Sequence, residues 1–362
     1  MQFAVYDSQR LAAGSVWKSR ERGGRVVPEE SRLEAPIFIV GGPRSGTTLL
    51  RNMVNRHPAI AICRETEFFH CVYNRRRTFG DLSGFENRRR AVERYLATER
   101  IGRMRVDMEA LRETLLREAT GYEAMYLSLL GFFARTHGKK RCGEKTPHYG
   151  MIAETLCEWY PGAAIIHLLR DPRDVVASML RMPWAPKSAI ANARTWLRYN
   201  LGAWRVRQRP NYLAVRYEEL VTRPERELSR ICAHVGEEYS PAMLVPNRDP
   251  AVRADWFRRA EEPVTTERLG KWREELTPSQ VALVESAVGS YMETFGYEAV
   301  GGRAPRWRAL GDAAAGAYGF VMMRVAQFPA SWYYLTASAN LAREEAAREQ
   351  YQKPGWRSRL LA

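Results

Sequence analysis

Short runs of apolar residues recur along the chain, and each is followed by a polar turn and then by a segment with helical apolar spacing. The clearest runs span 36–40 and 163–169, and weaker ones span 59–62 and 211–217. Continuous apolar runs of this length are typical of strands that are buried on both faces of a parallel sheet. The alternation of strands and helices therefore predicts an α/β fold, with an open parallel sheet covered by helices on both faces.

Apolar residues at helical spacing predict the helices that connect these strands. We expect helices over 47–56, 224–235 and 278–295, and Asp171-Pro172 should open another, because proline is favoured in the first turn. Residues 84–136 have a helical pattern throughout. They are predicted to form a helical insertion that covers one end of the sheet.

The same pattern divides the chain into three parts. Residues 1–34 are polar and rich in glycine and arginine, so we expect a flexible arm. Residues 35–300 hold the strands and form the predicted main domain. Residues 301–362 are basic, contain Trp and Tyr, and are predicted to form a helical tail.

An excess of positive charge points to anionic partners. The chain has 56 Lys and Arg residues against 41 Asp and Glu, a net charge of +15. The arginine runs 75–77 and 88–90 are interpreted as solvated faces or as a docking surface for an anionic or lipid-bearing molecule. No RNA-binding motif interleaves aromatic residues with them, so nucleic acid is not expected as a partner. Peripheral contact with a membrane through the basic or tail surface stays open.

The cysteines and the N-terminus predict a cytoplasmic protein. The five cysteines are odd in number and form no C-x-x-C pair, which argues against a disulfide framework or a zinc site. Residues 1–20 contain no apolar core of a signal peptide, and no run of 18 apolar residues occurs. We expect no metal, and the sequence indicates no oligomeric state.

The segment 41–48, Gly-Gly-Pro-Arg-Ser-Gly-Thr-Thr, lies between a predicted strand and a predicted helix. Backbone N–H groups in such a loop bind an anion, and the helix dipole reinforces them. Nucleoside-triphosphate P-loops have Lys where this chain has Thr47, and Arg44 supplies a cation from inside the loop instead. Thr47 therefore argues against a kinase-like phosphotransferase, which stays an alternative function. A basic protein that binds anionic polymers or membranes is a further alternative.

Residues 43–50 resemble the 5′-phosphosulfate loop of PAPS-dependent sulfotransferases, in the branch that includes tyrosylprotein sulfotransferases and many bacterial relatives. The resemblance covers roughly residues 36–295. It implies a P-loop-type fold and transfer of a sulfuryl group from 3′-phosphoadenylyl sulfate (PAPS) to a hydroxyl acceptor, with adenosine 3′,5′-bisphosphate as the product. The loop residues that would hold the 5′-phosphosulfate are Arg44, Ser45, Gly46, Thr47 and Thr48.

A second anion site is predicted where the strand 163–169 ends. Arg170 leaves the carboxyl end of that strand, and Ser178 lies eight residues later in the following helix. An arginine fork and a hydroxyl could hold one phosphate together. The segment resembles the 3′-phosphate motif of the family. By the same resemblance Tyr217 lies near the adenine, and Lys271, in a late loop, lies towards the nucleotide phosphates.

The acceptor hydroxyl has to lose a proton, and a carboxylate or histidine would take it. Glu65 follows a short predicted strand, and Arg64-Glu65-Thr66 resembles the Glu-Thr segment of tyrosylprotein sulfotransferases, at the same interval from the loop arginine. Glu67 is the rival base, followed by His70 and His148. Lys145 resembles the lysine of the family that stabilises charge on the bridging oxygen.

The sequence leaves the acceptor open among carbohydrate, lipid, phenolic compound and peptide. Its specificity is expected to lie in the insertion 84–136, on the acceptor side, in residues 183–200 and in the tail.

Overall fold

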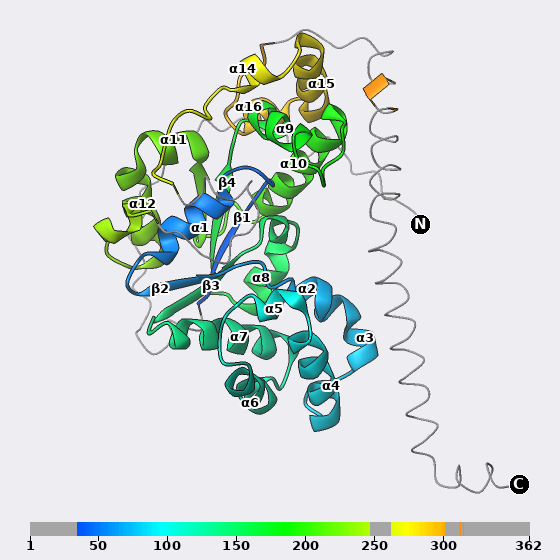
Figure 1. The fold of residues 1–362 in the computed structure, drawn as a ribbon, viewed down its shortest axis with the longest axis vertical. Helices are drawn as coiled ribbons and strands as arrows, with labels where there is room; N and C mark the ends of the chain where they lie inside the picture. Colours follow the sequence, from blue (N-terminus) through cyan, green and yellow to red (C-terminus); the bar gives the residue numbers. More distant parts are fainter. Residues whose placement is uncertain (1–34, 247–261, 301–310, 313, 315–362) are drawn as a thin grey trace, which may run out of the picture.

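The computed structural model describes residues 35–246, 262–300, 311–312 and 314. The predicted arm 1–34 and nearly all of the predicted tail 301–362 lie outside the described residues. The described part is built on five parallel strands in the order β2-β3-β1-β4-β5 (Figure 1). The strands are β1 (Ile37–Gly41), β2 (Ile60–Cys63), β3 (Arg141–Lys145), β4 (Ala164–Leu169) and β5 (Tyr212–Arg216).

Four of these strands confirm the predicted apolar runs, but β3 is a strand that the hydrophobic pattern did not predict. It is polar in sequence, yet all five of its residues are buried. Arg141 donates to the backbone oxygen of Ala35 at 3.3 Å and pairs with Glu237 at the same distance. Internal partners of this kind allow polar side chains to occupy a central strand.

Helices cover both faces of the sheet, as the alternating pattern predicts. Ile37 and Ile39 point to one face and pack against helices that follow β1 and β5, whereas Phe38 and Val40 point to the other. The first face is covered by α1 (Thr47–Asn55), α11 (Tyr217–Thr222) and α12 (Pro224–Val235). The second face is covered by α7 (Tyr122–Thr136), α8 (Ala153–Trp159) and α10 (Ala189–Trp204).

The helical insertion differs from its prediction in two ways. It begins at residue 68 rather than 84, and its helices are separated by turns. Its last helix, α7, packs on the face of β2 and β3 rather than at the end of the sheet alone (Figure 1). The earlier elements are α2 (Phe68–Cys71), η3 (Tyr73–Arg75), α3 (Arg76–Phe79), α4 (Phe85–Leu96), α5 (Glu99–Gly102) and α6 (Met108–Glu118).

Local capping explains why one helix does not run through the insertion. Arg105 has a positive φ of 54°, which an α-helix does not allow. Asp107 then starts α6 by accepting the N–H groups of Glu109 and Ala110, each at 3.0 Å. The apolar spacing continued across these turns and so concealed them.

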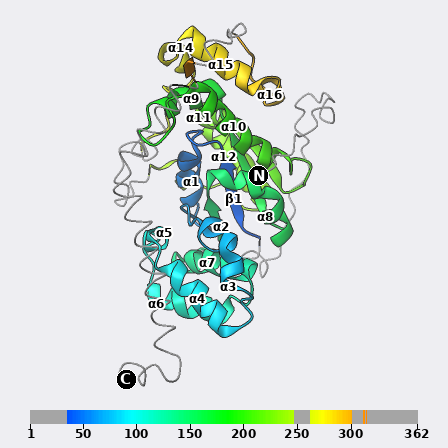
Figure 2. The ribbon, with the colours of Figure 1, turned by 90° about the vertical axis from the view of Figure 1, so that its right-hand side faces the viewer.

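The remaining elements lie at the opposite end of the molecule from the insertion (Figure 2). The predicted start of α9 at Pro172 is confirmed, whereas the helix predicted over 278–295 is interrupted at Gly289, which has a φ of 62°. No helix of the described residues is long and apolar enough to cross a membrane. The elements at the end opposite the insertion are α9 (Pro172–Leu180), α14 (Trp272–Glu275), α15 (Pro278–Val288) and α16 (Tyr291–Thr294). Two 3-10 helices, η4 (Pro147–Ile152) and η5 (Pro241–Leu244), lie elsewhere.

Candidate active site

The parallel sheet brings the predicted site segments to one edge. All five strands point the same way, so the residues that follow them meet at their carboxyl ends. The phosphate loop follows β1, the central strand, and a different predicted residue stands at the end of each other strand. These residues are Glu65 after β2, Lys145 at the end of β3, Arg170 after β4 and Tyr217 after β5.

The loop after β1 has the conformation of an anion cradle. Gly46 precedes α1 with a φ of 94°, and a Cβ atom there would lie 2.5 Å from the Tyr217 ring, so glycine is required. Arg44 also has a positive φ, of 63°. The Ser45 hydroxyl is buried and has no hydrogen-bond partner among the described residues. A buried unpartnered hydroxyl in a loop of this shape fits a bound oxyanion.

A cationic group lies beside this loop. The Arg44 Nε donates to the Ser178 hydroxyl at 3.2 Å, and Arg170 donates to the backbone oxygen of Arg44 at 3.2 Å. Burial, together with the nearby charges of Arg170 and Arg181, lowers the pKa of Arg44 to about 10. The Arg170 Nε is buried without a hydrogen-bond partner in the described part of the chain. The structure therefore places the two predicted anion sites next to each other, where a ligand with several negative charges would relieve the repulsion.

The late loop is held over this group by Arg170 and by Asp174, a residue that the sequence did not single out. Arg170 donates to the backbone oxygen of Arg268 at 2.7 Å and lies 4.2 Å from the centre of the Tyr217 ring. Asp174 accepts the N–H groups of Gly270 and Trp272 at 3.0 and 2.9 Å. The position of Asp174 in the first turn after Arg170 was the available signal.

Lys271, which belongs to the same late loop, points elsewhere. Its ammonium group donates to the Glu274 carboxylate at 2.7 Å, on the surface. The structure therefore brings the backbone of this loop to the cationic group but pairs the lysine with its own helix.

Glu65 and Lys145 form a direct ion pair across the β2 and β3 ends. The Lys145 side chain is 4% exposed, and its ammonium also lies 3.4 Å from the Thr48 hydroxyl in the phosphate loop. Burial opposes ionisation of Glu65, but the charge and hydrogen bond of Lys145 outweigh it and hold the pKa of Glu65 below its ordinary value. Through this pair, a carboxylate with a lowered pKa is joined to the phosphate loop.

The rival bases lie in different surroundings. The Glu67 carboxylate pairs with the ring of His148 at 3.3 Å, and Glu67 has a positive φ of 54° at the start of α2. Burial opposes ionisation of Glu67, but the hydrogen bond to His148 leaves its pKa lowered. His70 is exposed. Unlike these residues, Glu65 is connected to the phosphate loop through Lys145.

Glu144 is a buried carboxylate that ties the Glu65 segment to β3. It accepts the N–H and the hydroxyl of Thr66, each at 2.8 Å, and also the hydroxyls of Tyr126 and Thr146. Burial raises the pKa of Glu144 against these hydrogen bonds. Thr66 follows Glu65, and Glu144 precedes Lys145, so this clamp sets the distance between the two members of the ion pair.

Replacement of Glu144 by glutamine is expected to disturb that distance. The amide cannot accept all four donors, and an unsatisfied buried group costs about 1–3 kcal/mol. We expect a lower Tm and a kcat reduced roughly 10- to 100-fold for the folded fraction, because small displacements of reacting groups are costly. The Kd for adenosine 3′,5′-bisphosphate should stay the same.

Glu158→Gln, an exposed change on α8, is the matched control for that experiment. A lower Tm with an unchanged kcat per folded molecule would show that Glu144 only supports the fold.

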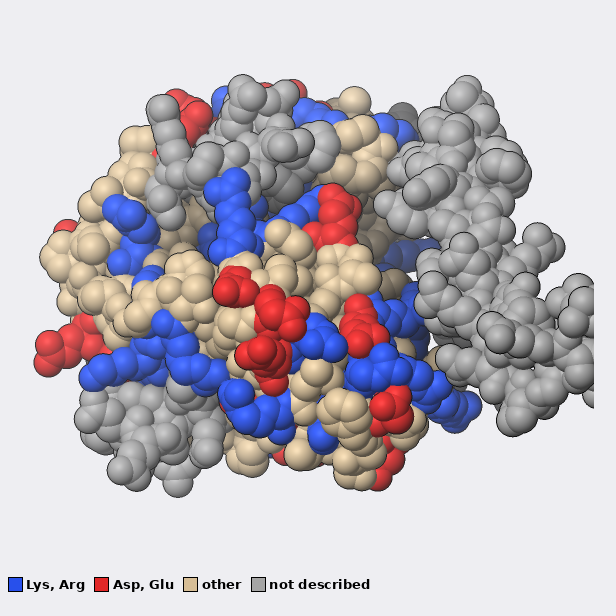
Figure 3. Space-filling view, turned by 60° about the horizontal axis from the view of Figure 1, so that its bottom comes forward, with Lys and Arg blue, Asp and Glu red and all other residues tan. Residues whose placement is uncertain are grey.

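The arginine runs of the insertion do not form a continuous cationic face. Arg89 pairs with Glu86 at 2.8 Å and with Glu93 at 3.0 Å, and Arg112 pairs with Glu109 at 3.2 Å. Figure 3, in which the lower end of Figure 1 comes forward, shows acidic side chains interspersed among the basic ones. In this view the surface charge is mixed, which favours the interpretation as a solvated face.

The chain matches known proteins over the part that carries this site. The model of the sulfotransferase family matches residues 36–241. Nodulation protein NoeE of Sinorhizobium fredii is 29% identical over 300 residues, covering 74% of this chain and 67% of that protein. Protein-tyrosine sulfotransferase 2 of Gallus gallus is 26% identical over 66% of this chain and 63% of its own.

Two further similarities extend this comparison. The omega-hydroxy-beta-dihydromenaquinone-9 sulfotransferase Stf3 of Mycobacterium tuberculosis is 24% identical, over 76% of this chain and 78% of that protein. Among solved structures, the sulfotransferase domain from the curacin biosynthetic pathway aligns with a TM-score of 0.52 at 20% identity, covering 75% of this chain and all of that one. That similarity supports the α/β fold.

Proposed function

The chain belongs to the sulfotransferase family, and on that premise we propose how its residues share the transfer of a sulfuryl group from PAPS to a hydroxyl acceptor. The observation that carries the proposal is the contact between the Glu65–Lys145 pair and the phosphate loop at Thr48. A proton acceptor, a buried cation and an anion cradle meet there at the edge of the sheet.

The donor would be held at two places. The loop from Arg44 to Thr48, with the buried hydroxyl of Ser45, takes the 5′-phosphosulfate, and the positive end of α1 reinforces it. Arg170 and Ser178 take the 3′-phosphate, and Tyr217, which packs against Arg170 and Gly46, lies against the adenine side. Lys271 is kept as a further contact to the phosphates, which requires it to leave Glu274.

The Glu65–Lys145 ion pair accepts the acceptor proton and stabilises the charge that develops during transfer. Glu65 takes the proton of the acceptor hydroxyl as the acceptor oxygen attacks sulfur in line with the bond to the bridging oxygen. Lys145, with Arg44, stabilises the negative charge that grows on that bridging oxygen as the bond breaks. Because Lys145 keeps Glu65 ionised, the base is ready over a wide pH range.

We further propose that residues 35–300 form the catalytic domain and that the protein works in a reducing compartment such as the cytoplasm. Packing of α15 and α16 on α9 and α10 supports the first part. None of the five cysteines forms a disulfide, and four of them are buried, which supports the second part. The relatives named above differ in acceptor, protein tyrosine in one case and a menaquinone in another, so they leave the acceptor of this chain to its own surface.

The role of the ion pair predicts a pH effect. With both substrates well below saturation, kcat/KM reports groups of the free protein. Its acidic limb should lie below pH 4.5, the ordinary pKa of glutamate, because Lys145 lowers the pKa of Glu65. In Lys145→Met the limb should move to higher pH, since burial then acts on Glu65 without the opposing charge.

Lys140→Met, an exposed change at the start of the same strand region, should leave the limb in place. An acidic limb that does not move in Lys145→Met would separate Glu65 from the proton transfer.

A further inference from the structure

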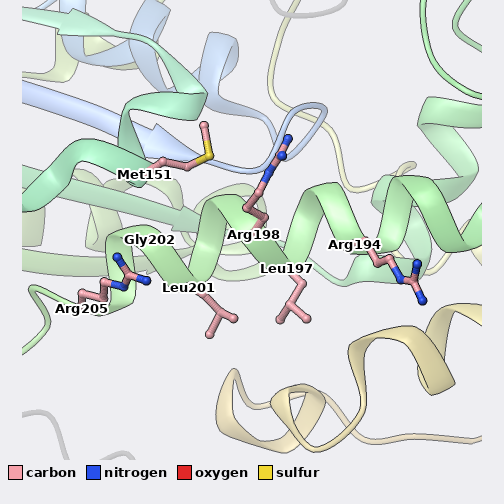
Figure 4. Close-up of a pocket in the computed structure, with 7 residues that line it drawn as sticks. All are labelled: Met151, Arg194, Leu197, Arg198, Leu201, Gly202 and Arg205. Carbon is pink, nitrogen blue, oxygen red and sulfur yellow. The ribbon is translucent and has the colours of Figure 1, made fainter. Parts of the chain in front are cut away.

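A groove of about 420 Å³ runs along the outer side of α10, next to η4 (Figure 4). It is distinct from the donor site, because the residues of α10 that face that site lie on the other side of the helix. Trp196 donates to the backbone oxygen of Arg170 at 3.0 Å, and a Cβ atom at Gly42 would lie 3.0 Å from the Trp196 ring. The volume is within the range of small-molecule sites.

The groove is lined by three apolar side chains and three arginines. In Figure 4, Leu197 and Leu201 extend from one side of α10, and Arg198 extends from the other, towards the side where Met151 lies. Leu197 and Leu201 are half-buried, and Met151, across from them on η4, is 38% exposed. The arginines lie along α10 at helical spacing and are all exposed. They are Arg194, Arg198 and Arg205.

Two of these arginines, Arg194 and Arg198, are available for an anionic ligand. Neither Arg194 nor Arg198 has a carboxylate partner in the part of the chain that the structure describes, and Arg198 lies 5.5 Å from the ring centre of Tyr199. Arg205 lies 3.7 Å from Glu154, and both of these side chains are more than half exposed.

The groove lies beside η4, which carries His148, the partner of Glu67. Met151 is three residues after His148, which pairs with Glu67 in the segment that carries Glu65. The ring of His148 lies 6.2 Å from that of Tyr199 on α10. At the crossing of η4 and α10, a Cβ atom on Gly202 would lie 2.6 Å from the Met151 Cα, so the two elements are in backbone contact. A molecule in the groove therefore lies beside η4 and α10, the two elements that flank His148 next to Glu67.

We propose that this groove binds the body of the acceptor, and that the acceptor is a hydroxylated long-chain carboxylate. The proposal rests on the proposed function, because it needs the hydroxyl to reach Glu65. The apolar chain covers Met151, Leu197 and Leu201, and the carboxylate pairs with Arg194 and Arg198. The charge of these two arginines favours the acid over a neutral alcohol of equal length.

The test compares terminally hydroxylated octanoate, dodecanoate and hexadecanoate with the diols of the same lengths and with a small phenol. We expect kcat/KM to rise with chain length, by up to about fourfold for each buried methylene, until the groove is filled. The acids should exceed the diols, and added salt should reduce that difference.

Variants assign these effects to the groove. The double change Arg194→Gln with Arg198→Gln should raise KM for the acids roughly three- to tenfold and leave the diols unchanged. Leu201→Asp should flatten the dependence on chain length. Arg226→Gln, an exposed change on α12, is the matched control and should alter neither KM for the acids nor the dependence on chain length.

The outcomes separate the two proposals. Equal kcat/KM for all chain lengths, or equal effects of the double change on acids and diols, would overturn the acceptor proposal. If the phenol is sulfated in a Glu65-dependent way but the hydroxy acids are not, the acceptor proposal fails and the proposed function stands. Sulfation of the phenol that persists in Glu65→Gln would instead overturn the proposed function. Hexadecanoate, which lacks the hydroxyl, should inhibit competitively with the acceptor. This measurement tests binding in the groove without requiring sulfuryl transfer.

Discussion

Replacement of Glu65 by glutamine is expected to lower kcat by on the order of 10²- to 10⁴-fold, the range found when a general base is lost. Glutamine keeps the size of the side chain and can still accept a hydrogen bond from Lys145, but it cannot take a proton. The loop and the cationic group that hold the donor are untouched. The Kd for adenosine 3′,5′-bisphosphate, measured by calorimetry, should therefore stay close to that of the unaltered protein.

The matched control is Glu67→Gln, which changes the rival carboxylate two residues away. Because Glu67 pairs with His148 rather than with Lys145, we expect a much smaller loss of kcat. A large loss of kcat in Glu67→Gln or His148→Asn, together with a nearly unchanged kcat in Glu65→Gln, would contradict the assignment. It would show that Glu67 or His148 is the base.

Replacement of Arg170 is expected to have the largest effect on donor binding. A charge-assisted hydrogen bond contributes roughly 1.5–3 kcal/mol, so Arg170→Met should weaken binding of adenosine 3′,5′-bisphosphate on the order of 10- to 100-fold. Adenosine 5′-monophosphate lacks the 3′-phosphate and should lose much less. The ratio of the two dissociation constants is thus the informative quantity.

Arg170 also has structural contacts, with the backbone oxygens of Arg44 and Arg268 and with the ring of Tyr217. Ser178→Ala provides a milder variant, since it removes one hydroxyl and leaves those contacts in place. Ser178→Ala should also reduce the preference for adenosine 3′,5′-bisphosphate over adenosine 5′-monophosphate, but by a smaller factor than Arg170→Met. Equal weakening of both nucleotides in both variants would mean that these residues do not contact a 3′-phosphate.

Much of the fold was predictable because local patterns and tertiary packing agree in it. The strands at 36–40 and 163–169 are continuous apolar runs in the centre of a parallel sheet, and α12 has both its proline start and its apolar stripe. Strand β3 was missed because Arg141, Glu144 and Lys145 look like a surface segment until their buried partners are known. Those partners come from distant parts of the chain, and no local pattern reports them.

The candidate site divides in the same way. Glycine spacing and strand ends singled out the loop and Arg170, and the resemblance to tyrosylprotein sulfotransferases favoured Glu65, with Glu67 as its rival. The clamps around them were not predictable, because Glu144 holds Thr66 and Asp174 holds the loop at Gly270 through contacts between segments far apart in sequence. The groove on α10 was not predicted, because it depends on how Met151 meets the helix; only part of it falls within 183–200, where acceptor specificity is expected.

The most direct test of the account is calorimetry of the unaltered protein with two nucleotides. The loop has Thr47 where a triphosphate-binding loop has lysine, and the group of Arg44, Arg170 and Ser178 lies beside it. We predict tight binding of adenosine 3′,5′-bisphosphate without added magnesium, and weak binding of ATP with magnesium. A clear preference for ATP with magnesium would contradict the assignment of the two anion sites to a 3′-phosphorylated sulfuryl donor.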